Sequence, residues 1–133
     1  MNPRRIVLDV WRAQRAVPFA WGSADCLCFA AACAEPILGR DPIAHLRGRY
    51  DSETGAKRLM VENGWRGMGD VAASIFPEIP VAQAHVGDWA LIVNPDGTEV
   101  IGVVAGERIA AKTQSGSGQA LLRTAARAFR VTP

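Results

Sequence analysis

The residue best suited to chemistry is Cys26, which follows a turn rich in chain-breaking residues. Pro18 and Gly22 interrupt regular structure before it, and Ser23 is a good helix N-cap. Apolar residues then recur at helical spacing. We therefore predict a buried helix with Cys26 in its first turn, where unpaired backbone amides and the helix dipole favour a thiolate. Such a thiolate can act as a nucleophile, although free cysteines more often serve as small core residues.

The other potential ligands do not form a metal-binding pattern. The three cysteines, Cys26, Cys28 and Cys33, have no standard zinc or iron–sulfur spacing, and His45 and His85 are distant in sequence. On one helix Cys26 and Cys33 would be about 10 Å apart, too far for a disulfide. We expect no metal, no other cofactor and reduced thiols, as in a protein assembled in a cytosol.

Size and composition are those of one soluble globular domain. The chain has 133 residues, 49% of them hydrophobic and 21% charged, and a net charge of +2. This charge is too small to indicate nucleic acid, and a nucleic-acid-binding module rests on arginine content alone. No apolar run approaches the ~20 residues of a membrane span, and no signal-peptide core is present. We expect a single domain over residues 1–133.

The period of the hydrophobic pattern changes from helical to alternating at about Val86. Before that point, helices are expected over residues 3–15, from the turn to residue 34 or 38, in a short segment carrying His45, and over 52–63 and 69–76. After it, strands are expected over 88–93, 99–105 and 108–112, then a flexible loop over 114–118 and strands over 119–122 and 128–131. This order predicts an α+β domain, in which the Cys26 helix packs on one face of a C-terminal antiparallel sheet.

Several motifs resemble those of NlpC-type cell-wall peptidases, which have a compact papain-like fold. The family has a Pro-Tyr-x-x-Gly-Gly turn followed by Asp-Cys-Ser-Gly, then a Gly-Asp-Leu-Val strand and a His-Val-Gly-Ile-Tyr strand. The corresponding segments are Val17–Gly22 followed by Asp25-Cys26, then Gly87–Ile92, Val100–Gly106 and Arg108–Ala111. The match is patchy between Gly39 and His85. The chain resembles still more closely the compact NlpC-related proteins of tailed-phage tail modules.

The resemblance keeps the nucleophile position but not its catalytic partners. Cys26 matches the nucleophile, whereas Val100 stands where the family has its histidine base and Ala110 where a polar residue orients that base. Phe19 stands where the family has a tyrosine, and Leu27-Cys28 replaces the Ser-Gly pair. Valine and alanine can neither deprotonate a thiol nor protonate a leaving amine. The resemblance therefore implies a catalytically degenerate member of the fold.

Two functions follow from this resemblance. The first is a structural, non-enzymatic component of a bacteriophage tail, at the tail tip or hub. It would be assembled in the host cytoplasm into the virion, with other hub, distal tail or tip proteins as partners and peptidoglycan as a further candidate ligand. Its partner surface would include Trp65, Met68 and Phe76, unless these form a satellite core under the loops.

The alternative is an active peptidoglycan-degrading cysteine endopeptidase, used by the tail during DNA entry, with Cys26 served by a displaced base. His85 is expected at the wrong end of the hairpin, roughly 15–20 Å from the base position. His45 lies in the poorly matched region, so the sequence leaves it open as a substitute base.

Overall fold

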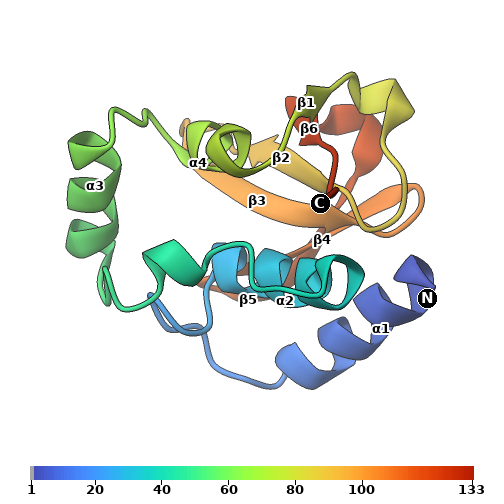
Figure 1. The fold of residues 1–133 in the computed structure, drawn as a ribbon, viewed down its shortest axis with the longest axis horizontal. Helices are drawn as coiled ribbons and strands as arrows, with labels where there is room; N and C mark the ends of the chain where they lie inside the picture. Colours follow the sequence, from blue (N-terminus) through green and yellow to red (C-terminus); the bar gives the residue numbers. More distant parts are fainter. Residues whose placement is uncertain (1) are drawn as a thin grey trace.

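The helices come first along the chain and the sheet almost entirely after them, as Figure 1 shows. The computed structural model describes residues 2–133, apart from the side chains of residues 116 and 117. The helices are α1 (Pro3–Gln14), α2 (Cys26–Leu38), α3 (Glu53–Glu62) and α4 (Met68–Ile75), with 3-10 turns η1 (Ala44–Leu46), η2 (Val81–Gln83) and η3 (Leu122–Thr124). The strands are β1 (Glu78–Ile79), β2 (Trp89–Val93), β3 (Glu99–Val104), β4 (Arg108–Thr113), β5 (Gly116–Leu121) and β6 (Arg127–Phe129). The α+β class predicted from the sequence is confirmed.

The six strands form one antiparallel sheet in the order β1-β6-β2-β3-β4-β5. Consecutive hairpins join β2 through β5, and the last strand, β6, returns to lie between β1 and β2. Two expectations are corrected here. The sheet is not built only from residues after Val86, because β1 precedes it, and β5 begins at Gly116, inside the segment predicted as a flexible loop. Strand β1 forms by pairing with β6, which is distant in sequence, and β5 forms by pairing with β4 across a tight turn. In both places this pairing outweighs the weak local strand propensity.

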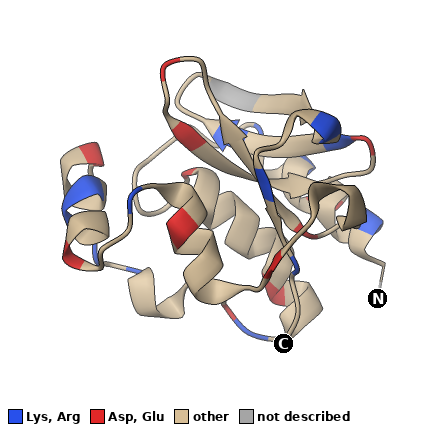
Figure 2. Cartoon of the chain, turned by 90° about the horizontal axis from the view of Figure 1, so that it is seen from above, with Lys and Arg blue, Asp and Glu red and all other residues tan. Residues whose placement is uncertain are grey.

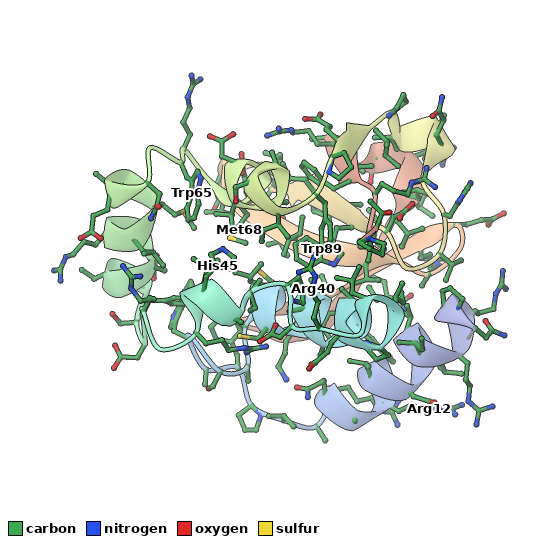
Figure 3. The ribbon with its side chains drawn as sticks, in the orientation of Figure 1. Arg12, Arg40, His45, Trp65, Met68 and Trp89 are labelled. Carbon is green, nitrogen blue, oxygen red and sulfur yellow. The ribbon has the colours of Figure 1, made fainter. Side chains whose placement is uncertain are left out.

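Helix α2 packs on the sheet across β3 and β4, and the main core lies between them. Trp89 of β2 is fully buried there, and its indole N–H donates to the carbonyl oxygen of Ala30 on α2 at 3.1 Å. Its ring meets that of Phe76 edge-to-face, with centroids 4.9 Å apart. Trp89 thus joins the sheet to α2 and to the end of α4, and Figure 3 shows it near the centre of the molecule.

The end of α1 is held by a buried lysine from the sheet. Lys112 of β4 is 2% exposed, and its ammonium donates to the carbonyl oxygens of Gln14 and Val17, each at 2.6 Å. The Gln14 carbonyl lies at the negative end of the α1 dipole, which favours a cation. Burial lowers the pKa of Lys112 because it disfavours the charged form.

The remaining charges are mixed in sign. Figure 2 shows acidic and basic residues interspersed along the helices and strands rather than gathered by sign. Within residues 2–133, no helix has both the length and the apolarity needed to cross a membrane.

Candidate functional site

Cys26 is the first residue of α2, as the sequence predicts, but a different residue caps the helix. Asp25, not Ser23, is the N-cap, and its Oδ1 accepts from the backbone N–H of Cys28 at 2.8 Å. The side chain of Cys26 is half-buried between α2 and β3. The backbone amides of Ile101 on β3 and of Leu27 lie near its sulfur and act to lower the pKa of the thiol. The candidate nucleophile therefore lies beside one backbone amide of the neighbouring strand and one of its own helix.

The surroundings of Cys26 keep its thiol protonated. Burial raises the pKa of the Cys26 thiol to about 12, and the negative charge of Asp25 acts in the same direction. The two backbone amides oppose this rise but do not overcome it. Desolvation thus outweighs the helix-terminus effect that favours a thiolate. Burial also raises the pKa of Cys28 to about 11 and that of Cys33 to about 12.

The two residues that the resemblance matches to lost acid–base groups, Val100 and Ala110, lie on different sides of the sheet. Ala110 of β4 is buried in the core beneath α2. On β3, Ile101 and Val103 belong to that core, whereas Val104 belongs to the cluster on the other face. Because side chains alternate along a strand, Val100 points away from α2. Val100, which the resemblance matches to the histidine beside the nucleophile, therefore does not face Cys26, and Ile101 is the β3 residue beside the sulfur.

The tyrosine hydroxyl at this site comes from Tyr50 and not from position 19, so it was not predicted from the sequence. Phe19 lies in the turn before α2, half-buried, with its ring edge-to-face to Trp21 at 5.1 Å. Tyr50, the only tyrosine in the chain, donates its hydroxyl to Oδ2 of Asp25 at 2.6 Å. Burial, with the Asp25 charge next, raises the pKa of Tyr50, so its hydroxyl remains a donor.

Asp25 is the polar centre of the site. Its carboxylate is 2% exposed and accepts three hydrogen bonds, from the backbone N–H of Cys28, from Tyr50, and from the backbone N–H of Gly22 at 2.9 Å. The last of these closes the turn, in which Ala20 and Ala24 also form a β-bridge. Asp25 thus fixes the turn, the start of α2 and the Tyr50 segment relative to one another. All its described contacts are structural.

A cavity of about 40 Å³ lies next to Cys26. Its lining is apolar and includes Trp21, Leu59 of α3, Trp65 and Met68. Figure 3 places Trp65 and Met68 at the end of the molecule that carries α3 and α4. Small-molecule sites usually have volumes of about 300–1,000 Å³. This space lies far below that range and is too small to enclose a peptide substrate.

The three residues proposed for a partner surface contribute instead to the interior. Phe76 is 2% exposed and packs on Trp89, so its assignment to a surface is wrong. Trp65 and Met68 are partly buried against the core and line the cavity. All three belong to the main core or pack against it, so they do not form a separate satellite core under the loops either.

Neither histidine is placed to serve Cys26. The backbone N–H of Gly87 donates to the carbonyl of Val104, so His85 lies at the Val104 end of β3, away from Ile101. The Nδ1 of His85 is 2.9 Å from a guanidinium nitrogen of Arg130. His45 is exposed on η1. Neither histidine lines the cavity or contributes to the charge acting on the thiol. Among the described residues, no group of histidine, cysteine or acidic side chains could hold a metal ion.

We expect Cys26 to react with iodoacetamide at pH 8 at least about 10³-fold more slowly than an activated cysteine, since only about 10⁻⁴ of a thiol with this pKa is ionised there. The rate should keep rising to at least pH 11, measured by mass spectrometry of the Cys26 peptide. A plateau below pH 8 would contradict the structure.

The same ionisation makes stability depend on pH. In the folded protein the pKa values of the three thiols are raised above the ordinary value of 9.0, so folding favours the protonated forms. This contribution is complete below about pH 9 and is lost as the pH rises towards 11–12. The free energy of unfolding, measured with denaturant, should be lower at pH 10 than at pH 8. This difference should be smaller when Cys33, whose pKa is raised by burial alone, is replaced by alanine.

Comparison with known proteins assigns the chain to a family without assigning it a function. No curated protein sequence matches it. The model of a domain family of unknown function, DUF6950, matches residues 4–131, which include every helix except the first residue of α1 and every strand. The chain therefore belongs to the DUF6950 family.

Proposed function

We propose that this protein is a structural, non-catalytic component of a bacteriophage tail, at the tail tip or hub, built on a degenerate NlpC-like version of the papain-like fold. The observation that carries the proposal is the state of Cys26. The thiol stands at the start of the central helix, where a peptidase of this type would hold its nucleophile, yet its pKa is raised to about 12 and no imidazole faces it.

The arrangement of elements supports the fold assignment within this proposal. A helix bearing Cys26 at its first residue packs on β3 and β4 of an antiparallel sheet, and the β2–β3 hairpin follows it in the chain. These are the parts expected from the resemblance. Because a fold hosts many functions, the functional argument rests on the site and not on this arrangement.

The chemistry of the site argues against peptide hydrolysis. A cysteine peptidase needs a thiolate and a proton donor for the leaving amine. Here burial opposes the thiolate, the neighbouring β3 and β4 side chains are Ile101 and Ala110, and the adjoining cavity is too small for a peptide. Asp25 and Tyr50 hold the turn and the helix together. The site thus retains its framework without an acid–base pair.

The test compares assembly with hydrolysis, using the phage or prophage whose genome encodes the chain. Deleting its gene should abolish infectious particles and leave tails incomplete in electron micrographs. The Cys26→Ala variant should still give infectious particles and complete tails. Purified wild-type protein should release no muropeptides from peptidoglycan, with an active NlpC-type enzyme as the positive control. If wild type releases muropeptides and Cys26→Ala does not, the protein is the alternative, a peptidoglycan-degrading cysteine endopeptidase. Normal tails after deletion would also overturn the proposal.

A further inference from the structure

The outer edge of β5 presents backbone groups that no other element pairs. The strand lies at one end of the sheet, beside β4. The backbone N–H of Leu122 donates to the carbonyl of Glu107 at 2.8 Å, which fixes the alternation of the ladder. Gly118 and Ala120 therefore bond to β4, and the N–H and C=O of Gln119 point outward. Within the described part of the chain, these two groups have no hydrogen-bond partner.

The residues of β5 do not protect this edge. Natural sheets blunt their edges with lysines, prolines, bulges or very short strands. Strand β5 has the sequence GSGQAL, without a charge or a proline, and its register with β4 is unbroken from Leu121 to Gly116.

The opposite edge of the sheet, formed by β1, is different. Strand β1 has two residues between Pro77 and Pro80, and its Glu78 is held by Arg127 at 2.7 Å.

We propose that β5 pairs antiparallel with β5 of a second copy of this chain, about a two-fold axis at Gln119, and so joins the two sheets into one. Among the described strands, β1 is too short and too constrained to accept β5, so head-to-tail growth is not available. Pairing of β5 with itself uses the same surface on both copies and closes as a dimer. This inference does not depend on the proposed function.

The charges around β5 are compatible with self-pairing. In a register centred on Gln119, each N–H of that residue donates to the partner copy's Gln119 carbonyl. Arg123 lies four residues beyond Gln119, so the two copies of Arg123 stand roughly 25 Å apart at the ordinary strand rise. Like charges therefore do not oppose one another across the contact.

The dimer should be weak. A contact between two edge strands buries much less than the ~1,600 Å² of a standard interface, so we expect a dissociation constant on the order of 10–1,000 µM. Sedimentation velocity of the full chain, from about 5 µM to about 1 mM, covers this range. Wild type should shift reversibly from monomer to dimer with concentration, without larger species.

Two charge variants test whether the two-fold axis of the proposed dimer lies at Gln119. The exposed Gln119 faces its own copy, so Gln119→Lys and Gln119→Glu should each weaken the dimer by up to about fivefold through like-charge repulsion. An equimolar mixture of the two should form a heterodimer as strong as the wild-type dimer or stronger. Ala73→Lys, at an exposed position of α4, is the matched charge control and should behave like wild type. Circular dichroism melts confirm that each variant is folded.

Three results would overturn the proposal: wild type that stays monomeric throughout, Gln119→Lys that dimerises like wild type, or a mixture of the charge variants that does not associate. Gln119→Pro gives a second route to the same answer. It removes an N–H that points outward and leaves the bonds to β4 in place, so a folded Gln119→Pro variant should lose the dimer.

Discussion

Replacing Asp25 with alanine should lower the free energy of unfolding by about 3–5 kcal/mol, because it leaves one buried and two part-buried donors without their acceptor at once. The carboxylate accepts from the backbone N–H groups of Gly22 and Cys28 and from the Tyr50 hydroxyl, at 2.6–2.9 Å. It is also the N-cap of the central helix, and loss of a cap alone costs about 1 kcal/mol. Urea unfolding followed by tryptophan fluorescence would measure the change.

Two milder variants show which part of that loss belongs to each contact. Asp25→Asn keeps the side-chain shape but presents an NH₂ group to one set of donors, so we expect an intermediate loss. Tyr50→Phe removes a single donor and should cost about 1–2 kcal/mol. In the double variant the two losses should not add, because both act on the Oδ2 contact. An Asp25→Ala protein within 1 kcal/mol of wild type would show that the network does not stabilise the fold.

The helices and the central hairpin were predictable because their signals are local. Ser52 caps α3 as predicted, with its hydroxyl accepting from the N–H of Gly55, and the turn before Gly97 joins β2 to β3. The position of Cys26 at the start of α2 followed from the breakers before it and the apolar spacing after it. These features depend on residues within about one or two turns of each other, which a single sequence contains.

The features that could not be predicted from the sequence depend on contacts between distant segments. Ser23 and Asp25 are both good caps, and the choice of Asp25 is stabilised by Tyr50, 25 residues away. Strand β1 is recognisable only through its pairing with β6, at Glu78 and Phe129. Pro36 lies inside α2 rather than ending it, and Gly39, with a φ of 76°, supplies the actual end.

The register of β3 bears on the position that the motif resemblance gives to the lost base. The motif resemblance assigned the lost base to Val100, but the register of β2 with β3 places Leu91 opposite Ile101, both in the core under α2. Because strand side chains alternate, a shift of one residue moves a side chain to the other face of the sheet. A histidine at position 100 would therefore face away from the thiol, so restoring it would not restore an acid–base pair.

Replacing Gly22 with alanine should lower the free energy of unfolding by about 2–5 kcal/mol, from backbone strain and a backbone collision together. Gly22 has a φ of 84°, where an L residue costs about 1–2 kcal/mol. A Cβ there would also collide with the carbonyl oxygen of Tyr50, which is backbone and cannot rotate aside. The turn and the Tyr50 segment would have to separate, weakening both hydrogen bonds to Oδ2 of Asp25.

The Gly97→Ala variant measures the backbone strain without the collision. Gly97 has nearly the same φ, 86°, but a Cβ at this position meets no atom within 4 Å. Its substitution should cost only the strain, about 1–2 kcal/mol. The difference between the two variants, measured by urea unfolding under one condition, reports how tightly the Tyr50 segment is held against the turn before Cys26. Equal losses would mean that the segment moves freely, in which case Asp25 and Tyr50 could not hold the start of α2 in place.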